Sequence, residues 1–124
     1  MYHYWYAIWM KTPILEVYFF KTETNNEPVR QWLKLLTAKD KKLIGEDIKT
    51  IQFGWPLGMP LVKHIDGGIW EVRSKLSGGI ARVLFVLEGN SIVLVHAFMK
   101  KQQKTPKPDI DIAKHRAKQL RRIL

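Results

Sequence analysis

The sequence contains no cysteine, and this absence removes several kinds of chemistry. Disulfides, thiolate catalysis and cysteine-ligated zinc sites are all excluded. Acidic residues are also few, at 11 in 124, and their scattered positions argue against a nuclease built on clustered carboxylates and two metal ions. No GxSxG, Walker A or HExxH motif is present, and the four histidines do not have metal-ligand spacing. We therefore expect neither a metal nor another cofactor.

Positive charge is what the chain has in excess: 21 Lys and Arg against 11 Asp and Glu give a formal net charge of +10. This balance indicates a polyanionic partner, which can be RNA, DNA, an acidic protein or an anionic membrane surface. With 46% hydrophobic residues, we expect one folded domain over residues 1–124. The aromatic start, residues 1–12, is shorter than a membrane span of ~20 residues and lacks the pattern of a signal peptide. We expect it to be an extra strand or a tail, and the protein to be cytoplasmic with no membrane partner.

Local patterns predict a strand followed by two helices in the first half of the chain. Residues 14–20 are rich in β-branched and aromatic side chains, as strands are. The Asn-Glu-Pro sequence at 26–28 indicates a helix start, and apolar residues then recur at helical spacing. A second helix is expected to begin at Thr37, which forms a capping box with Asp40, and to end by Gly54.

The second half of the chain predicts strands and a final helix. Residues 55–60, with two prolines and a glycine, predict a loop. Strands are expected at roughly Ile69–Lys75, Ile80–Glu88 and Ser91–Met99, because short Gly-containing connections separate them as in antiparallel hairpins. Residues 108–124 carry an apolar stripe at helical spacing. This order predicts an α+β fold, in which helices pack on one twisted antiparallel sheet.

Alternation along the strands places charged side chains on one face. Arg73 and Lys75 share a face with Glu71 on the first of the three strands. On the second strand Arg82 is the only charge between Ile80 and Leu87, and there it is costly unless it has a partner or a function. Two interpretations stay open: Arg82 forms a structural ion pair with Glu71 across the hairpin, or it binds phosphate.

Basic residues are concentrated at the end of the chain. The last 25 residues contain nine Lys and Arg and two acids. The cluster Lys100–Lys104 follows a predicted strand, and a basic cluster at a strand exit suits the backbone of a single RNA strand. His96, in that strand, is either a hydrogen-bonded core residue or part of the site.

RNA cleavage is a reaction that basic residues can catalyse. RNA supplies its own nucleophile, the 2′-hydroxyl, so the protein has to align that oxygen with phosphorus, stabilise charge in the transition state and exchange protons. Lys and Arg can stabilise the charge. A Lys crowded by other cations has a lowered pKa, which suits it to proton exchange.

The segment Trp70–Pro106 carries a family resemblance. Its motifs WEVR, RVLF and FMKKQQKTP occur together, with a hydrophobic strand before the last of them. This combination resembles the phage-derived, HigB-like branch of the RelE/ParE toxin superfamily, and the similarity extends over roughly residues 15–120. One departure is Ala97-Phe98, where the family usually has Gly-Phe.

The resemblance implies a RelE-like fold of β-α-α-β-β-β order with a C-terminal helix, and the function of a toxin in a type II toxin-antitoxin system. It implies a metal-independent endoribonuclease, an mRNA interferase, that cuts mRNA on the ribosome, inhibits translation and is silenced by a helix-turn-helix antitoxin. We expect four residues to be catalytic: Arg73, Arg82, Lys100 and Lys101. We expect four others to contact RNA: Lys75, His96, Gln103 and Lys104.

Two other functions stay open. A ParE-like toxin that acts on DNA gyrase shares the fold, so the fold does not decide the function. A generic basic nucleic-acid-binding module would need only the charged tail. The strand arginines and the lysines that follow favour the nuclease, because a gyrase inhibitor needs no basic active site.

Overall fold

The computed structural model describes residues 14–100 and 104–123. Its elements, in chain order, are β1 (Glu16–Phe19), α2 (Pro28–Lys34), α3 (Ala38–Gly54), β2 (Val62–Asp66), β3 (Ile69–Leu76), β4 (Gly79–Glu88), β5 (Ser91–Lys100) and α4 (Lys107–Ile123). The α+β class and the final helix are confirmed. The extra strand or tail expected for residues 1–12 lies outside the described residues.

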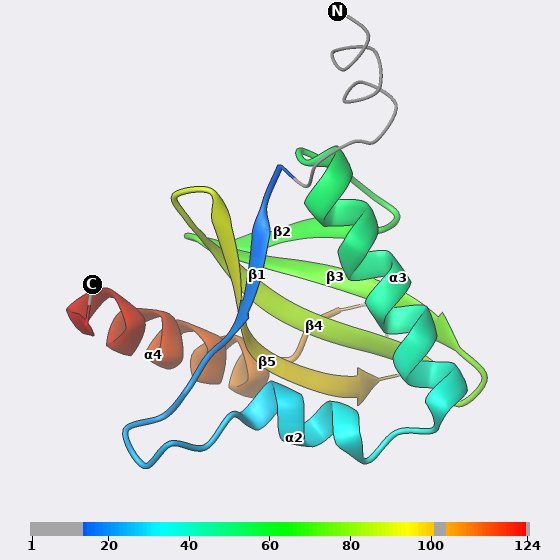
Figure 1. The fold of residues 1–124 in the computed structure, drawn as a ribbon, viewed down its shortest axis with the longest axis horizontal. Coiled ribbons are helices and arrows are strands. Elements are labelled where there is room, and N and C mark those ends of the chain that lie inside the picture. The colour runs from blue at the N-terminus through cyan, green and yellow to red at the C-terminus, as the bar shows by residue number, and fades with distance from the viewer. Residues whose placement is uncertain (1–13, 101–103, 124) are drawn as a thin grey trace, which may run out of the picture.

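The five strands form one sheet in the order β1-β5-β4-β3-β2 (Figure 1). From β5 to β2 each neighbouring pair is antiparallel, and the β5–β4 and β4–β3 pairs are the hairpins that the sequence predicts. Strand β1 instead joins the edge parallel to β5, which is possible because a long crossover separates the two strands in the chain. The sheet is therefore mixed, with an antiparallel part that carries the predicted hairpins.

Strand β2 is an addition to the predicted elements. It pairs with β3 through a tight turn at Gly67-Gly68, where Gly67 has a φ of +53°. A two-glycine turn between alternating segments is a sequence signal for a hairpin, because glycine adopts positive φ without steric cost. The signal was therefore present just before the predicted start of β3.

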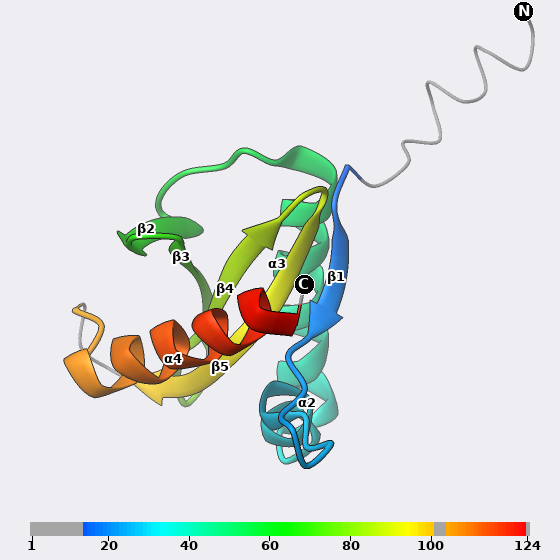
Figure 2. The same cartoon turned by 90° about the vertical axis from the view of Figure 1, so that its left-hand side faces the viewer.

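Helices cover both faces of the sheet, and each face has its own core (Figures 1 and 2). Helix α3 contributes Ile44, Ile48 and Ile51 to one core, whereas α4 contributes Ala113 and Ala117 to the other. Alternate residues of β4 enter the two cores, which explains why this strand is almost continuously apolar in sequence. Within the described part of the chain, no helix is both long and apolar enough to cross a membrane.

An extra residue in β5 changes which side chains face α4. Val95 has no partner in the register between β4 and β5, so the strand is bulged there, and His96 lies opposite Leu84. Val95 and His96 consequently both contact the α4 side instead of alternating. Arg116 of α4 donates a hydrogen bond to the Val95 carbonyl oxygen at 2.7 Å. The bulge thus supplies an anchor point for α4.

Helix α3 begins where the sequence predicts. Thr37 is its N-cap, and the Thr37 hydroxyl oxygen accepts a hydrogen bond from the Asp40 backbone N–H at 3.2 Å. This bond satisfies one of the N–H groups that the first turn of a helix leaves without a partner. The helix then continues to Gly54, which confirms the predicted end.

We expect Thr37→Ala to lower the free energy of unfolding by about 1 kcal/mol, because the Asp40 N–H loses its acceptor. Thr50→Ala is the matched control on the same helix. The Thr50 hydroxyl bonds the Glu46 carbonyl, and alanine is the better helix former, so the change should stay within about 0.5 kcal/mol. Urea unfolding followed by circular dichroism measures both; equal losses would mean that the cap does not stabilise the fold.

Candidate active site

Two arginines face each other across the β3–β4 hairpin. Arg73 and Arg82 are register partners, so their Cβ atoms lie about 5 Å apart. Both lie on the α4 side of the sheet, since Leu84, two residues after Arg82, belongs to the core under that helix. Like charges this close repel each other strongly when they are buried. The pair therefore needs a negative charge beside it.

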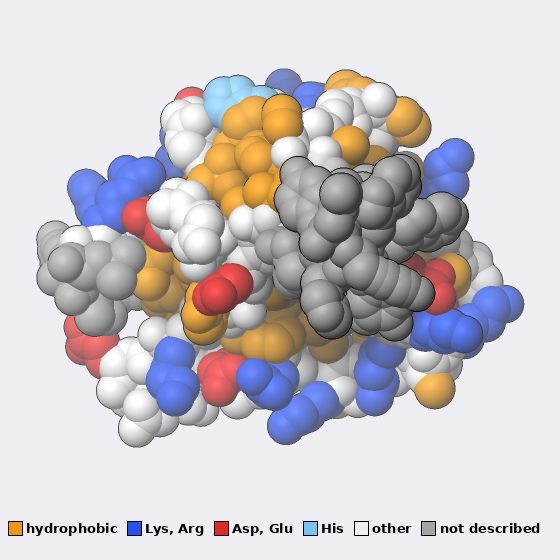
Figure 3. Space-filling model, turned by 45° about the horizontal axis from the view of Figure 1, so that its top comes forward, with side chains coloured by type: hydrophobic (Ala, Val, Ile, Leu, Met, Phe, Trp, Pro, Cys, Tyr) orange, Lys and Arg blue, Asp and Glu red, His pale blue; other side chains and the backbone are white. Residues whose placement is uncertain are grey.

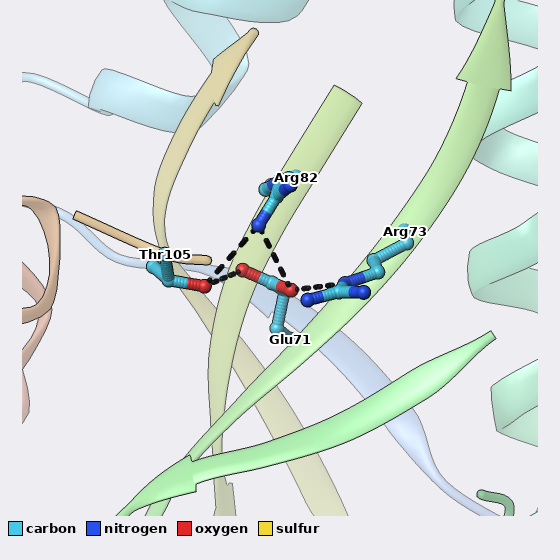
Figure 4. A network of polar contacts seen from close by, with 4 residues as sticks. All are labelled: Glu71, Arg73, Arg82 and Thr105. Atoms are coloured by element: carbon cyan, nitrogen blue, oxygen red, sulfur yellow. Dashed lines mark hydrogen bonds and ion pairs between the residues drawn. The ribbon is translucent and has the colours of Figure 1, made fainter. Parts of the chain in front are cut away.

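Glu71 supplies that charge (Figure 4). Its Oε1 accepts a hydrogen bond from Arg73 Nε at 2.6 Å and lies 3.8 Å from Arg82 Nη1. Its Oε2 accepts a hydrogen bond from the Thr105 hydroxyl at 2.5 Å, and Arg82 Nη1 lies 3.5 Å from the same hydroxyl oxygen. These four residues, which we call the Glu71 network, join β3, β4 and the segment before α4.

The two arginines differ in their access to solvent. The Arg82 side chain is 0% exposed, whereas that of Arg73 is 10% exposed. Burial lowers the pKa of the Arg82 guanidinium below its usual value, and Glu71 opposes this effect; an arginine nevertheless keeps its charge. The ion pair with Glu71, one of the two interpretations from the sequence, is present. Phosphate binding by Arg82 stays a prediction.

Lysines lie one row further along the same sheet face. Lys75 of β3 and Lys100 of β5 are both opposite Ile80, the β4 residue between them, so their strands are about 10 Å apart. Lys75 is exposed and Lys100 is partly exposed, and Lys104 is exposed before α4. Two predicted site residues, Lys101 and Gln103, lie outside the described residues.

His96 contacts α4 instead of open solvent. Its Nε2 lies 2.7 Å from the Asp109 carboxylate and its Nδ1 lies 3.4 Å from Arg116 Nη1. The side chain is 14% exposed. These contacts agree with the interpretation of a hydrogen-bonded structural histidine, and they help to hold α4 against the sheet. Contact between His96 and RNA stays a prediction.

Thr105 is the member of the Glu71 network that the sequence did not reveal. It is buried just before α4, and the only signal was a hydroxyl residue between Lys104 and Pro106 in a basic segment. Glu71 was expected only as a partner for Arg82. In the part of the chain that the structure covers, no three His, Asp or Glu residues are placed to hold a metal ion.

The surface at the top end of the molecule in Figure 1 carries hydrophobic side chains as well as basic ones. Figure 3 looks toward this end and shows hydrophobic side chains gathered near the middle of the visible surface, with Lys and Arg toward its edges. Met59, in the loop after α3, is 63% exposed. The visible part of this end is therefore not a continuous basic surface, and the basic residues described above lie on the α4 side of the sheet.

Comparison with known proteins places the site in a family. Residues 31–118 match the family described as "Phage derived protein Gp49-like (DUF891)". The chain belongs to this Gp49-like family. The matched residues include the whole Glu71 network, so the buried ion pairs lie within the part of the chain that is similar to this family.

Two curated relatives extend the comparison. Over 99 residues, this Gp49-like chain is 33% identical to proteins named "Probable endoribonuclease HigB1" from Mycobacterium tuberculosis strains CDC 1551 / Oshkosh and ATCC 25618 / H37Rv. The alignments cover 80% of this chain and 71% of each relative. Together with the family match, they confirm the resemblance to the phage-derived, HigB-like branch of the superfamily.

We expect Glu71→Gln to lower the free energy of unfolding by about 3–5 kcal/mol, because two facing arginines lose their compensating charge. Glu88→Gln is the matched control: Glu88, which is partly exposed, contacts the exposed Arg121 at 3.8 Å, so the loss of this pair should cost less than about 1 kcal/mol. Chemical unfolding compares them, and similar losses would contradict a stabilising role for Glu71. If the Glu71 variant does not fold, Thr105→Val, which removes one hydroxyl of the network, should cost about 1–3 kcal/mol.

Proposed function

We propose that this chain is the toxin of a type II toxin-antitoxin system: an endoribonuclease that cuts mRNA on the ribosome without a metal ion and so inhibits translation. The observation that carries the proposal is the arginine pair held by the buried Glu71 carboxylate, in a chain whose relatives are named probable endoribonucleases. We further propose that residues 1–124 form a single toxin domain that acts in the cytoplasm. Its partner is a cognate helix-turn-helix antitoxin.

The chemistry needs only what RNA and basic side chains provide. The 2′-oxygen attacks the adjacent phosphorus and loses its proton, while the bond from phosphorus to the 5′-oxygen breaks and that oxygen gains a proton. The products are a 2′,3′-cyclic phosphate and a 5′-hydroxyl. Negative charge grows on the phosphoryl oxygens in the transition state, and donors that are already oriented stabilise it most.

Arg73 is the residue that we assign to the phosphoryl group. Its Nε is tied to Glu71, which fixes the plane of the guanidinium, and it is the more exposed arginine of the pair. Arg82 adds positive charge from within the protein and holds Glu71 in place, so in this conformation it acts through its neighbours. We assign proton transfer to Lys100 or Lys101. We assign RNA contacts to Lys75, His96, Gln103 and Lys104.

We expect Arg73→Ala to slow mRNA cleavage by about 10²–10³-fold, the usual loss when one oriented donor to a transition state is removed. Arg30→Ala is the matched control, since Arg30 is exposed on α2 and pairs with Glu27. The measurement is the mapping of new 5′ ends in mRNA bound to purified ribosomes, with circular dichroism to show that both variants are folded. Equal cleavage by the two variants would remove Arg73 from the site.

Three further outcomes decide the finer parts of the proposal. We expect the protein to cleave ribosome-bound mRNA at an unchanged rate after it has been treated with EDTA and the chelator has been removed before mixing, because basic side chains supply the charge stabilisation; loss of cleavage would contradict a metal-independent reaction. Equal cleavage of free and ribosome-bound mRNA would contradict dependence on the ribosome.

Intact mRNA together with arrested DNA supercoiling in expressing cells would show that gyrase is the target.

A further inference from the structure

A second basic site lies at the other end of α4 from the Glu71 network. A pocket of about 380 Å³ opens between the β2–β3 turn and the second half of α4. Gly67 and Gly68 line it from the turn, and Lys114, Lys118 and Arg121 line it from the helix. None of these residues has a role in the cleavage site proposed above.

The pocket carries net positive charge. Asp66 is the one carboxylate among the described lining residues, and it is paired with Lys114. That pairing holds the pKa of Asp66 below its usual value, so the two opposite charges compensate each other. Within the described residues Lys118 has no ion pair, and Arg121 Nε lies 3.8 Å from a carboxylate oxygen of Glu88. Lys118 and the two Nη groups of Arg121 have no hydrogen bond within these residues, so they stay available to a ligand.

The glycine turn allows a close approach between the Arg121 side chain and the backbone. A Cβ atom on Gly68 would lie 3.0 Å from Arg121 Nη2, which is tighter than an ordinary van der Waals contact. The absence of a side chain at Gly68 thus leaves room for the guanidinium at the edge of the pocket. Glycine backbone beside Arg and Lys suits a phosphate group, because the backbone can approach closely and the guanidinium can donate two parallel hydrogen bonds.

We propose that this pocket binds a phosphate of the RNA backbone at a distance from the cleaved bond. The proposal rests on the proposed ribonuclease function and adds a second contact on the same side of the sheet. From Lys107, two residues after Thr105, to Lys118 the chain advances about 16 Å along α4. A stacked nucleic-acid strand advances ~3.4 Å per nucleotide, so the two contacts are about five nucleotides apart. The second contact holds the strand in register while Arg73 engages the reacting phosphate.

The test compares two double variants with the same change in charge. One is Lys118→Gln with Arg121→Gln in the pocket. The control is Lys39→Gln with Lys42→Gln, two exposed lysines of α3, which covers the opposite face of the sheet. The probe is a fluorescent 12-nucleotide RNA with 2′-O-methyl groups, which the protein cannot cleave because the nucleophile is blocked. Anisotropy titrations at several salt concentrations measure its affinity for the full chain.

We expect the pocket variant to bind this RNA about tenfold more weakly, and the control pair to bind like the unchanged chain. The plot of log affinity against log salt has a negative slope, and the magnitude of this slope should decrease by about 0.7, the value for one phosphate of a single strand. Equal affinities and slopes for the two variants would overturn the inference.

Two more outcomes distinguish an RNA phosphate site from a site for a free anion, and this inference from the proposed function. If inorganic pyrophosphate binds the unchanged chain but not the pocket variant, while both bind RNA equally, the pocket takes a free anion and the inference is wrong. If RNA binding depends on the pocket but ribosome-bound mRNA stays intact, the inference stands and the proposed function is contradicted.

Discussion

The buried Glu71 carboxylate is the interaction on which the rest of the site depends. Arg73 and Arg82 are register partners, so any sheet with this pairing brings two positive charges together. Burying them is costly, and only well-placed opposite charge and hydrogen bonds offset that cost. Glu71 contacts both arginines and also accepts a hydrogen bond from Thr105. One carboxylate thus links the strand pairing, the orientation of Arg73 and the start of α4.

The position of α4 follows from a second set of polar contacts. Asp109 bonds His96, and Arg116 bonds the Val95 carbonyl that the bulge leaves outside the ladder. Ala113 and Ala117 face the sheet, and their small side chains let the helix lie close to it. The helix is therefore fixed in register with β5, which places Thr105 over the arginine pair and Lys118 beside the β2–β3 turn.

The parts of the fold that the sequence predicts are those with local causes. The Thr37 cap and the glycine turns act within a few residues, so the start of α3 and the β3–β4–β5 hairpins could be predicted. The parallel pairing of β1 and the contact of Thr105 with Glu71 join residues far apart in the chain, and no local pattern encodes them. Strand alternation placed Arg73 on one face with Glu71 and Lys75, and the apolar residues around Arg82 singled that arginine out. The sequence could not decide between an ion pair and phosphate binding for Arg82, because that depends on burial and distance.

The two cores differ in size, and this difference determines which helix separates from the sheet first when the protein unfolds locally. The α3 side is packed by isoleucines within the larger cluster of buried residues, whereas α4 meets the sheet through two buried alanines, the partly buried Leu120 and a few polar bonds. Separating α4 from the sheet exposes less apolar surface than separating α3 does. Helix α4 is therefore the smaller cooperative unit and the one that detaches at lower free energy. Its amides should exchange with solvent deuterium before those of α3. Arg82, enclosed while α4 is seated, would become accessible in that same opening.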